Sequence, residues 1–118
     1  MRGITIYHNP RCRKSRDTLA LLEAAGKTPT IIHYLKTPPD EATLRTLAAR
    51  LGMRPKEFIR KGEAEFKSLG LKEKLEDDKA LYTAMTQHPK LIERPIVVSG
   101  EKAILGRPPE NVKTLLSE

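Results

Sequence analysis

The chain has 118 residues, a length typical of one domain, and 38% of them are hydrophobic, which is too many for a disordered chain. A net charge of +7 fits either nucleic acid or a small anion as partner. Aromatic residues make up only 4% and none is Trp, which disfavours stacking on bases, so we expect no nucleic-acid partner and a largely solvated basic surface.

The chain carries a single cysteine, Cys12, so no internal disulfide can form, and this fits a reducing compartment. The opening MRGITIYHNP becomes polar too early for a secretion signal. No apolar run approaches the roughly 18 residues that a membrane-spanning helix needs. We therefore expect a cytoplasmic protein with no membrane partner.

The first third of the chain predicts a strand, a helix and a second strand. Ile4–Tyr7 is a β-branched and aromatic run that stops at the turn signal Asn9-Pro10. Apolar residues at helical spacing predict a helix over Arg13–Ala25, with Gly26 just past its end. Thr30–Leu35 is predicted as a second strand, and such a crossover favours parallel pairing.

The middle of the chain is predicted to be helical because apolar residues recur there at i, i+3, i+4 and i+7. Three helices are expected: one capped by Asp40 and ended by Gly52, one from Pro55 to Arg60 or Lys61, and one capped by Asp78 and ended by Pro89.

The last third predicts a hairpin and a helix. Ile96–Val98 and Ala103–Leu105 are expected strands joined at Ser99-Gly100, and a final helix starts at Pro109. The order is β-α-β, a helical insertion at about 40–90, then β-β-α. We expect one α/β domain over residues 1–118, a four-stranded mixed sheet flanked by helices, as in the thioredoxin-like fold.

The loop between the first strand and the first helix contains Cys12. The first backbone N–H groups of a helix lack intrahelical partners and carry the positive end of the helix dipole. A thiolate is therefore favoured at this place, and we expect the pKa of Cys12 to lie below that of free cysteine. The alternative is a small, buried and inert cysteine.

The neighbours of Cys12 suggest how the thiolate is stabilised. We expect the stabilising loop to comprise Asn9, Arg11, Arg13 and Ser15. Arg11 and Arg13, like Lys14 and Arg16, add positive potential that solvent weakens, and the Ser15 hydroxyl can donate to the sulfur. Because Ser15 stands where a C-x-x-C motif has its second cysteine, disulfide chemistry requires an outside thiol.

The histidines are less informative than the cysteine. His8 either tunes or shuttles protons near Cys12 or is a turn residue at the end of the strand. His33 and His88 have no partner pattern, so no metal site is expected.

Three arginines, Arg60, Arg94 and Arg107, fall at the ends of predicted elements. Guanidinium groups fit tetrahedral oxyanions through paired hydrogen bonds, and together the three could bind a multiply charged anion. The alternative for each is a solvated surface side chain. The sequence pattern leaves open whether they meet.

Several segments match one family. These are ITIYHNPRC with Ser15-Arg16 and Thr18-Leu19, the turn Thr37–Pro39, FIRK around Arg60, FKSLGL, QHPKLIERPIVV and GRPPE. On these motifs the chain resembles the bacterial glutaredoxin/glutathione-dependent arsenate reductases of the thioredoxin-like superfamily. Because Arg13-Lys14 follow the cysteine and the chain stops soon after the last helix, it is most similar to their short chromosomal branch.

The resemblance implies a function and roles for particular residues. It implies that arsenate is the substrate, glutathione a co-substrate and glutaredoxin a partner, with no bound cofactor. It makes Cys12 the nucleophile and His8 a contributor to thiolate formation. It makes Arg60, Arg94 and Arg107 the oxyanion ligands, and it gives Pro95 a structural role, with a cis bond after Arg94.

Two other functions are compatible with a redox cysteine in this loop. One is another glutathione-linked thiol oxidoreductase, which needs Cys12 but not all three arginines. The other is an Spx-type regulator that binds RNA polymerase. Such regulators typically carry C-x-x-C in this loop, so Ser15 argues against that function.

Overall fold

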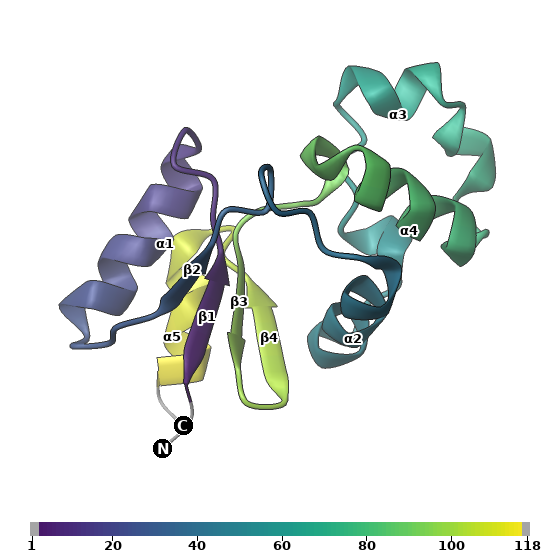
Figure 1. Ribbon diagram of the computed structural model, residues 1–118. Coiled ribbons are helices and arrows are strands. Elements are labelled where there is room, and N and C mark those ends of the chain that lie inside the picture. The colour runs from purple at the N-terminus through teal and green to yellow at the C-terminus, as the bar shows by residue number, and fades with distance from the viewer. Residues whose placement is uncertain (1–2, 117–118) are drawn as a thin grey trace. The chain divides into compact units, whose positions relative to one another are not determined.

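The computed structural model describes residues 3–116, and their backbone forms two compact units (Figure 1). Residues 3–37 and 94–116 form the first, which we call the sheet unit. Pro38–Glu93 forms the second, the helical unit. None of the helices in the described range is long and apolar enough to span a bilayer.

The sheet unit contains four strands in the order β2-β1-β3-β4. They are β1 (Ile4–Tyr7), β2 (Thr30–Ile32), β3 (Ile96–Ser99) and β4 (Lys102–Leu105). β1 pairs with β2 in parallel and with β3 antiparallel, and β3 and β4 form the predicted hairpin. The mixed four-stranded sheet of a thioredoxin-like fold is therefore confirmed.

Helices pack on one face of this sheet. α1 (Arg13–Ala24) and α5 (Lys113–Leu116), which follows a 3₁₀ turn at Pro109–Val112, contribute to one apolar core. Its buried members are Ile4, Ile6, Leu22, Val97, Val112 and Leu115. Because side chains alternate along a strand, Ile4 and Ile6 point to the same face of the sheet. They therefore determine which face of β1 packs against α1.

The second strand is shorter than predicted. β2 stops at Ile32 because the carbonyl of His33 accepts hydrogen bonds from the N–H groups of Lys36 and Thr37. These bonds close a turn over residues 33–37, so Leu35 lies outside the strand.

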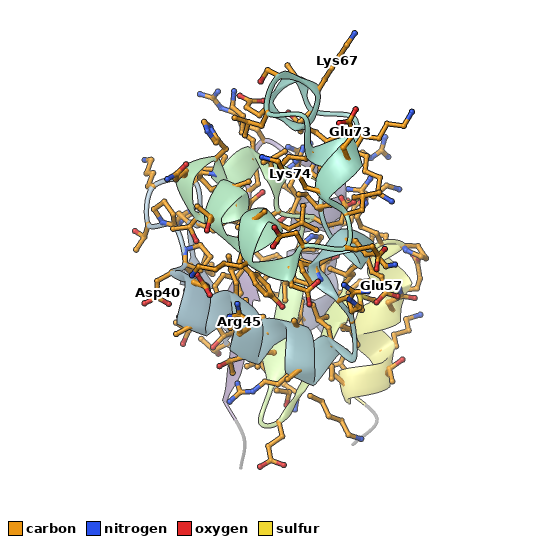
Figure 2. The ribbon with its side chains drawn as sticks, turned by 90° about the vertical axis from the view of Figure 1, so that its right-hand side faces the viewer. Asp40, Arg45, Glu57, Lys67, Glu73 and Lys74 are labelled. Atoms are coloured by element: carbon orange, nitrogen blue, oxygen red, sulfur yellow. The ribbon has the colours of Figure 1, made fainter. Side chains whose placement is uncertain are left out.

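The helical unit is built of α2 (Glu41–Leu51), α3 (Ala64–Ser68) and α4 (Asp78–Gln87), with 3₁₀ turns at Pro55–Glu57, Leu71–Lys74 and Pro89–Leu91 (Figure 2). The predicted cap of α2 is confirmed, because the Asp40 carboxylate accepts from the N–H of Thr43 at 2.8 Å. The cap of α4 is Asp77 rather than Asp78, since Asp77 accepts from the N–H of Ala80.

The helix predicted from Pro55 is only a 3₁₀ turn ending at Glu57. Ile59 pairs with Ile92 in an isolated antiparallel bridge, and the N–H of Arg60 donates to the carbonyl of Leu91 at 2.7 Å. This pairing with a segment about 30 residues away replaces the intrahelical bonds that a longer helix would need.

Candidate active site

A tight turn leads from β1 to Cys12. The N–H of Cys12 donates to the carbonyl of Asn9 at 3.0 Å, with Pro10 at the second position of the turn, where its fixed φ is favourable. The Asn9 side-chain oxygen accepts from the N–H of Arg11 at 3.0 Å, so this buried residue closes the turn twice. The turn leaves Cys12 with extended backbone as the N-cap of α1.

The environment of the Cys12 sulfur favours the thiolate. Partial burial raises the pKa of the Cys12 thiol. The backbone N–H of Ser15, the Arg94 guanidinium through a hydrogen bond and its charge, and the backbone N–H of Lys14 outweigh that burial. The net result is a pKa below the ordinary value, in the direction that the helix N-terminus predicts.

The exposed cations of the loop lower the pKa of Cys12 less than the sequence suggested. Arg11, Arg13, Lys14 and Arg16 all have exposed side chains, and the Arg13 side chain is 87% accessible. None of these side chains is among the groups that chiefly lower the Cys12 pKa. Solvent screens their charge, whereas the partly buried Arg94 and the helix amides act at short range.

The Ser15 hydroxyl does not serve as predicted. Ser15 is completely buried, and its Oγ lies 2.7 Å from His8 Nδ1 and accepts from the N–H of Asn9 at 3.1 Å. Helical side chains tilt towards the helix N-terminus, which directs this hydroxyl to the end of β1. The expectation that it donates to the sulfur is therefore corrected: the backbone N–H of Ser15 takes that place.

His8 is held as a neutral hydrogen-bond partner. Only 5% of the residue is accessible, and burial lowers its pKa, as do the nearby charges of His33 and Arg16. Its ring also meets that of His33 edge-on, with centroids 6.1 Å apart. The imidazole is thus uncharged at neutral pH and joins Ser15 and Asn9 in one buried network.

Two of the three predicted arginines, Arg94 and Arg107, are in contact with each other in the sheet unit, and Arg94 is the one beside Cys12. Arg94 reaches the sulfur, and Arg107 Nη1 donates to the Arg94 carbonyl at 3.3 Å. The Arg94-Pro95 bond is cis, as the resemblance implied, and so is Arg107-Pro108. Within residues 3–116, the buried Nε of Arg94 has no hydrogen-bond partner.

Arg60 belongs to the helical unit, where carboxylates already bind it. Its Nε lies 3.2 Å from Glu63 Oε2, and its Nη1 lies 3.1 Å from Glu93 Oε1. Sequence reasoning did not anticipate these ion pairs. A role for Arg60 in an oxyanion site stays a prediction.

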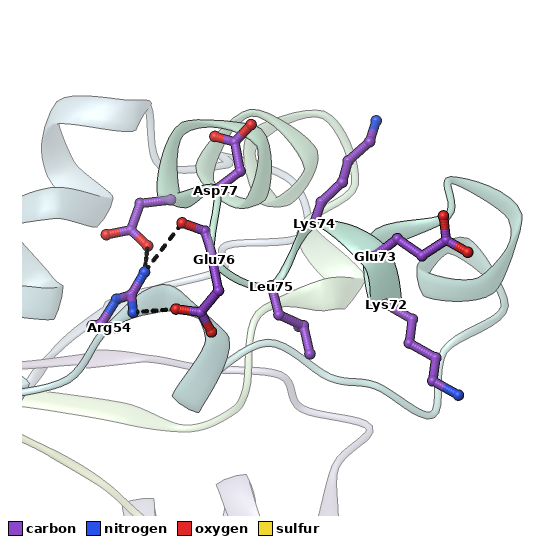
Figure 3. A pocket seen from close by; sticks show the side chains of 8 residues that line it. Arg54, Lys72, Glu73, Lys74, Leu75, Glu76 and Asp77 are labelled. Carbon is purple, nitrogen blue, oxygen red and sulfur yellow. Dashed lines mark hydrogen bonds and ion pairs between the residues drawn. The ribbon is translucent and has the colours of Figure 1, made fainter.

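The helical unit also contains an open hollow of about 770 Å³ lined by Arg54 and residues 72–78 (Figure 3). Arg54 bridges Glu76 and Asp78 there, each at 2.7 Å. None of the predicted site residues lines it. Arg54, Glu76 and Asp78 are paired with one another there, which is typical of a solvated structural surface.

Two residues of the sheet unit that sequence reasoning did not assign support the arginines. The buried Thr18 hydroxyl lies 2.8 Å from the Lys14 carbonyl, to which it donates, and 3.4 Å from the Gly106 carbonyl. The N–H of Gly106 donates to the Pro95 carbonyl at 2.9 Å. The available signals were a threonine between Ser15 and Leu22 on the buried face of the helix and a glycine directly before Arg107.

Comparison with known proteins shows which family this chain belongs to. The model of the ArsC family matches residues 7–115. The chain belongs to the ArsC family. The resemblance seen in the sequence motifs is thereby confirmed at the level of the family.

Relatives within the ArsC family include both named enzymes and a protein without an assigned activity. The chain is 45% identical to an arsenate reductase of Escherichia coli, covering all of this chain and 84% of the relative. It is 51% identical to the uncharacterized protein YfgD of the same organism, covering 92% of each. The solved structure of an arsenate reductase from Vibrio cholerae matches 96% of this chain and 97% of its own, with a TM-score of 0.92 and 47% identity.

Proposed function

We propose that this ArsC-family chain reduces arsenate to arsenite, with Cys12 as the nucleophile. The observation that carries the proposal is the Cys12 sulfur at the N-terminus of α1, beside the Arg94 guanidinium. An ionised sulfur next to a guanidinium group is what attack on an oxyanion requires. The named arsenate reductases among the relatives support the choice of oxyanion.

In the first step, Arg94 and Arg107 hold arsenate, with Arg60 as a third proposed ligand. The Cys12 thiolate attacks arsenic, an S–As bond forms, and an As–O bond breaks as its oxygen takes up a proton and leaves as water or hydroxide. The guanidinium groups offset the charge that develops on the arsenate oxygens.

In the second step, the thiolate of glutathione attacks the Cys12 sulfur. An S–S bond forms, the S–As bond breaks, and its electron pair goes to arsenic, which leaves as arsenite. A glutaredoxin thiolate then attacks the mixed disulfide and releases the Cys12 thiolate. Two outside thiols thus supply the two electrons, which suits a chain with one cysteine and a serine at position 15.

The buried residues of the loop act as positioning residues in this proposal. Asn9 closes the turn before Cys12, and Ser15 connects that turn to His8. His8 contributes to the thiolate by holding the turn in place through this network. Because its pKa is lowered, the ring is uncharged at neutral pH and adds no charge beside the sulfur. The cytoplasm, where glutathione keeps thiols reduced, is the expected compartment.

The direct test measures arsenite formed from arsenate with glutathione and glutaredoxin, in wild type and in Cys12→Ser. We expect the wild type to form arsenite only when arsenate, glutathione and glutaredoxin are all present. Cys12→Ser should form none. Equal arsenite formation by both proteins would overturn the assignment.

Arg94→Ala separates an arsenate reductase from another thiol oxidoreductase. Removing one oxyanion donor is expected to lower arsenate turnover about a hundredfold. Exchange of Cys12 with a neutral disulfide should fall far less. Equal losses in both reactions would favour a general thiol oxidoreductase.

A further inference from the structure

Three exposed cations around Cys12 have no task in the proposed reaction. Arg11, Arg13 and Lys14, which we call the loop cations, extend into solvent and are not among the chief groups that lower the Cys12 pKa. In the described part of the chain their one ion pair joins Arg13 Nε to Asp17, at 3.8 Å between two exposed side chains. Such a pair neutralises little, so the cluster keeps its positive charge.

The loop cations lie next to the partly exposed Cys12 along the chain. Arg11 and Arg13 are the sequence neighbours of Cys12, and the backbone N–H of Lys14 is one of the groups that face the sulfur. The first turn of α1 contains no acidic residue. A reactant that approaches the partly exposed sulfur therefore meets positive charge.

We propose that the loop cations select, as the thiol that attacks Cys12, a small thiol that carries carboxylate groups. This inference rests on the proposed function, in which glutathione is such a thiol, and adds the residues that select it. The incoming thiolate forms an S–S bond with the Cys12 sulfur, and the atom bonded to that sulfur leaves with the electron pair. The carboxylates do not react; they lie against the loop cations, which raise the local concentration of the anion.

The test uses the full chain and no arsenate, so its outcome is independent of the substrate assignment. Cys12 is first converted with 2,2′-dithiodipyridine to a mixed disulfide whose thiopyridyl group is neutral. Release of 2-thiopyridone then reports attack by 3-mercaptopropionate, which is anionic, or by 2-mercaptoethanol, which is neutral. The readout is the second-order rate constant for 3-mercaptopropionate divided by that for 2-mercaptoethanol. Each rate constant is corrected for the thiolate fraction of the reagent.

Two double variants remove the same charge from different places. Arg13→Gln/Lys14→Gln, the loop variant, removes two of the three loop cations. Lys27→Gln/Lys102→Gln is the matched control, because Lys27 follows the far end of α1 and Lys102 pairs with Ser99 in the hairpin, at the end of the sheet opposite Tyr7. Glutamine retains helix propensity at both loop positions.

We expect the loop variant to lower the ratio about three- to tenfold, and added salt to lower the wild-type ratio towards that of the variant. The control should stay within about twofold of wild type. An unchanged ratio in the loop variant, or an equal fall in the control, would overturn the proposal. If the double variant fails to fold, Lys14→Glu alone must lower the ratio, and an unchanged ratio there has the same consequence.

Discussion

A Cβ atom placed on Gly106 would lie 2.5 Å from Thr18 Oγ1 and 2.7 Å from Pro95 Cγ, so the end of β4 approaches α1 more closely than any side chain at position 106 permits. Arg107 follows Gly106, and Arg94 precedes Pro95. This contact therefore sets where both arginines stand relative to the helix whose N-cap is Cys12.

Gly106→Ala should move the arginines without removing them. Overpacking of this kind costs about 1–3 kcal/mol of unfolding free energy. We expect the KM for arsenate to rise about tenfold, because misplaced donors weaken the binding of the oxyanion. Alkylation of Cys12 by iodoacetamide, which needs no oxyanion site, should change much less.

The matched control is Gly3→Ala, since a Cβ on Gly3 meets nothing within 4 Å and Gly3 has no positive φ. It should leave both measurements near wild type. A Gly106→Ala protein with unchanged KM would show that the close contact does not position the arginines.

Ser15→Ala tests the buried network beneath the turn. The change leaves His8 Nδ1 and the N–H of Asn9 without their partner. Unsatisfied buried polar groups cost about 1–3 kcal/mol, so urea should unfold the variant at a lower concentration. Ser68→Ala is the control, because the Ser68 hydroxyl is exposed and donates only to the Glu65 carbonyl at 3.3 Å. Equal unfolding midpoints for Ser15→Ala and wild type would contradict the structural role of the network.

The pH dependence of Cys12 alkylation should reveal which cation stabilises the thiolate. Only the thiolate reacts, so a lowered pKa of Cys12 lets the reaction persist to lower pH, and loss of a stabilising group shifts the midpoint upward. Arg94→Ala should therefore raise the midpoint of the rate–pH profile. Arg13→Ala should scarcely move it, because that side chain is not among the chief groups that lower the pKa. A larger shift in Arg13→Ala would reverse this ranking.

Local sequence patterns predicted the elements that local forces determine. The spacing of apolar residues predicted β1 and α1, the turn residues predicted the hairpin, and a capping residue predicted the Asp40 cap. Each of these signals acts over a few residues. The same local reasoning placed Cys12 at a helix N-terminus and gave the direction of its pKa shift.

Contacts between distant segments account for what the sequence did not reveal. The bond from Arg60 to Leu91 ended the helix expected from Pro55, and the hydroxyl of Ser15 found His8 instead of the sulfur. The two carboxylates beside Arg60 come from separate segments of the chain, at positions 63 and 93. None of these partners follows from the spacing of residue types.

Glu63→Gln tests whether Arg60 must leave its carboxylates to bind an oxyanion. In the proposed reaction Arg60 is an arsenate ligand, yet Glu63 and Glu93 already occupy its guanidinium at 3.2 and 3.1 Å. Arsenate must then compete with them, and a neutral amide at position 63 competes less than a carboxylate. We expect the KM for arsenate to fall about two- to fivefold, a modest change because partly exposed pairs are weak.

The control for this substitution is Glu73→Gln, which removes the same charge from an exposed side chain in the helical unit. It should leave the KM for arsenate near wild type, because Glu73 forms no ion pair with Arg60 in the described chain. If Glu63→Gln instead raises the KM while Glu73→Gln does not, the carboxylate orients Arg60 for the substrate rather than competing with it. If neither changes the KM and Arg60→Ala is also silent, Arg60 is a structural ion-pair residue of the helical unit and the oxyanion is held by Arg94 and Arg107.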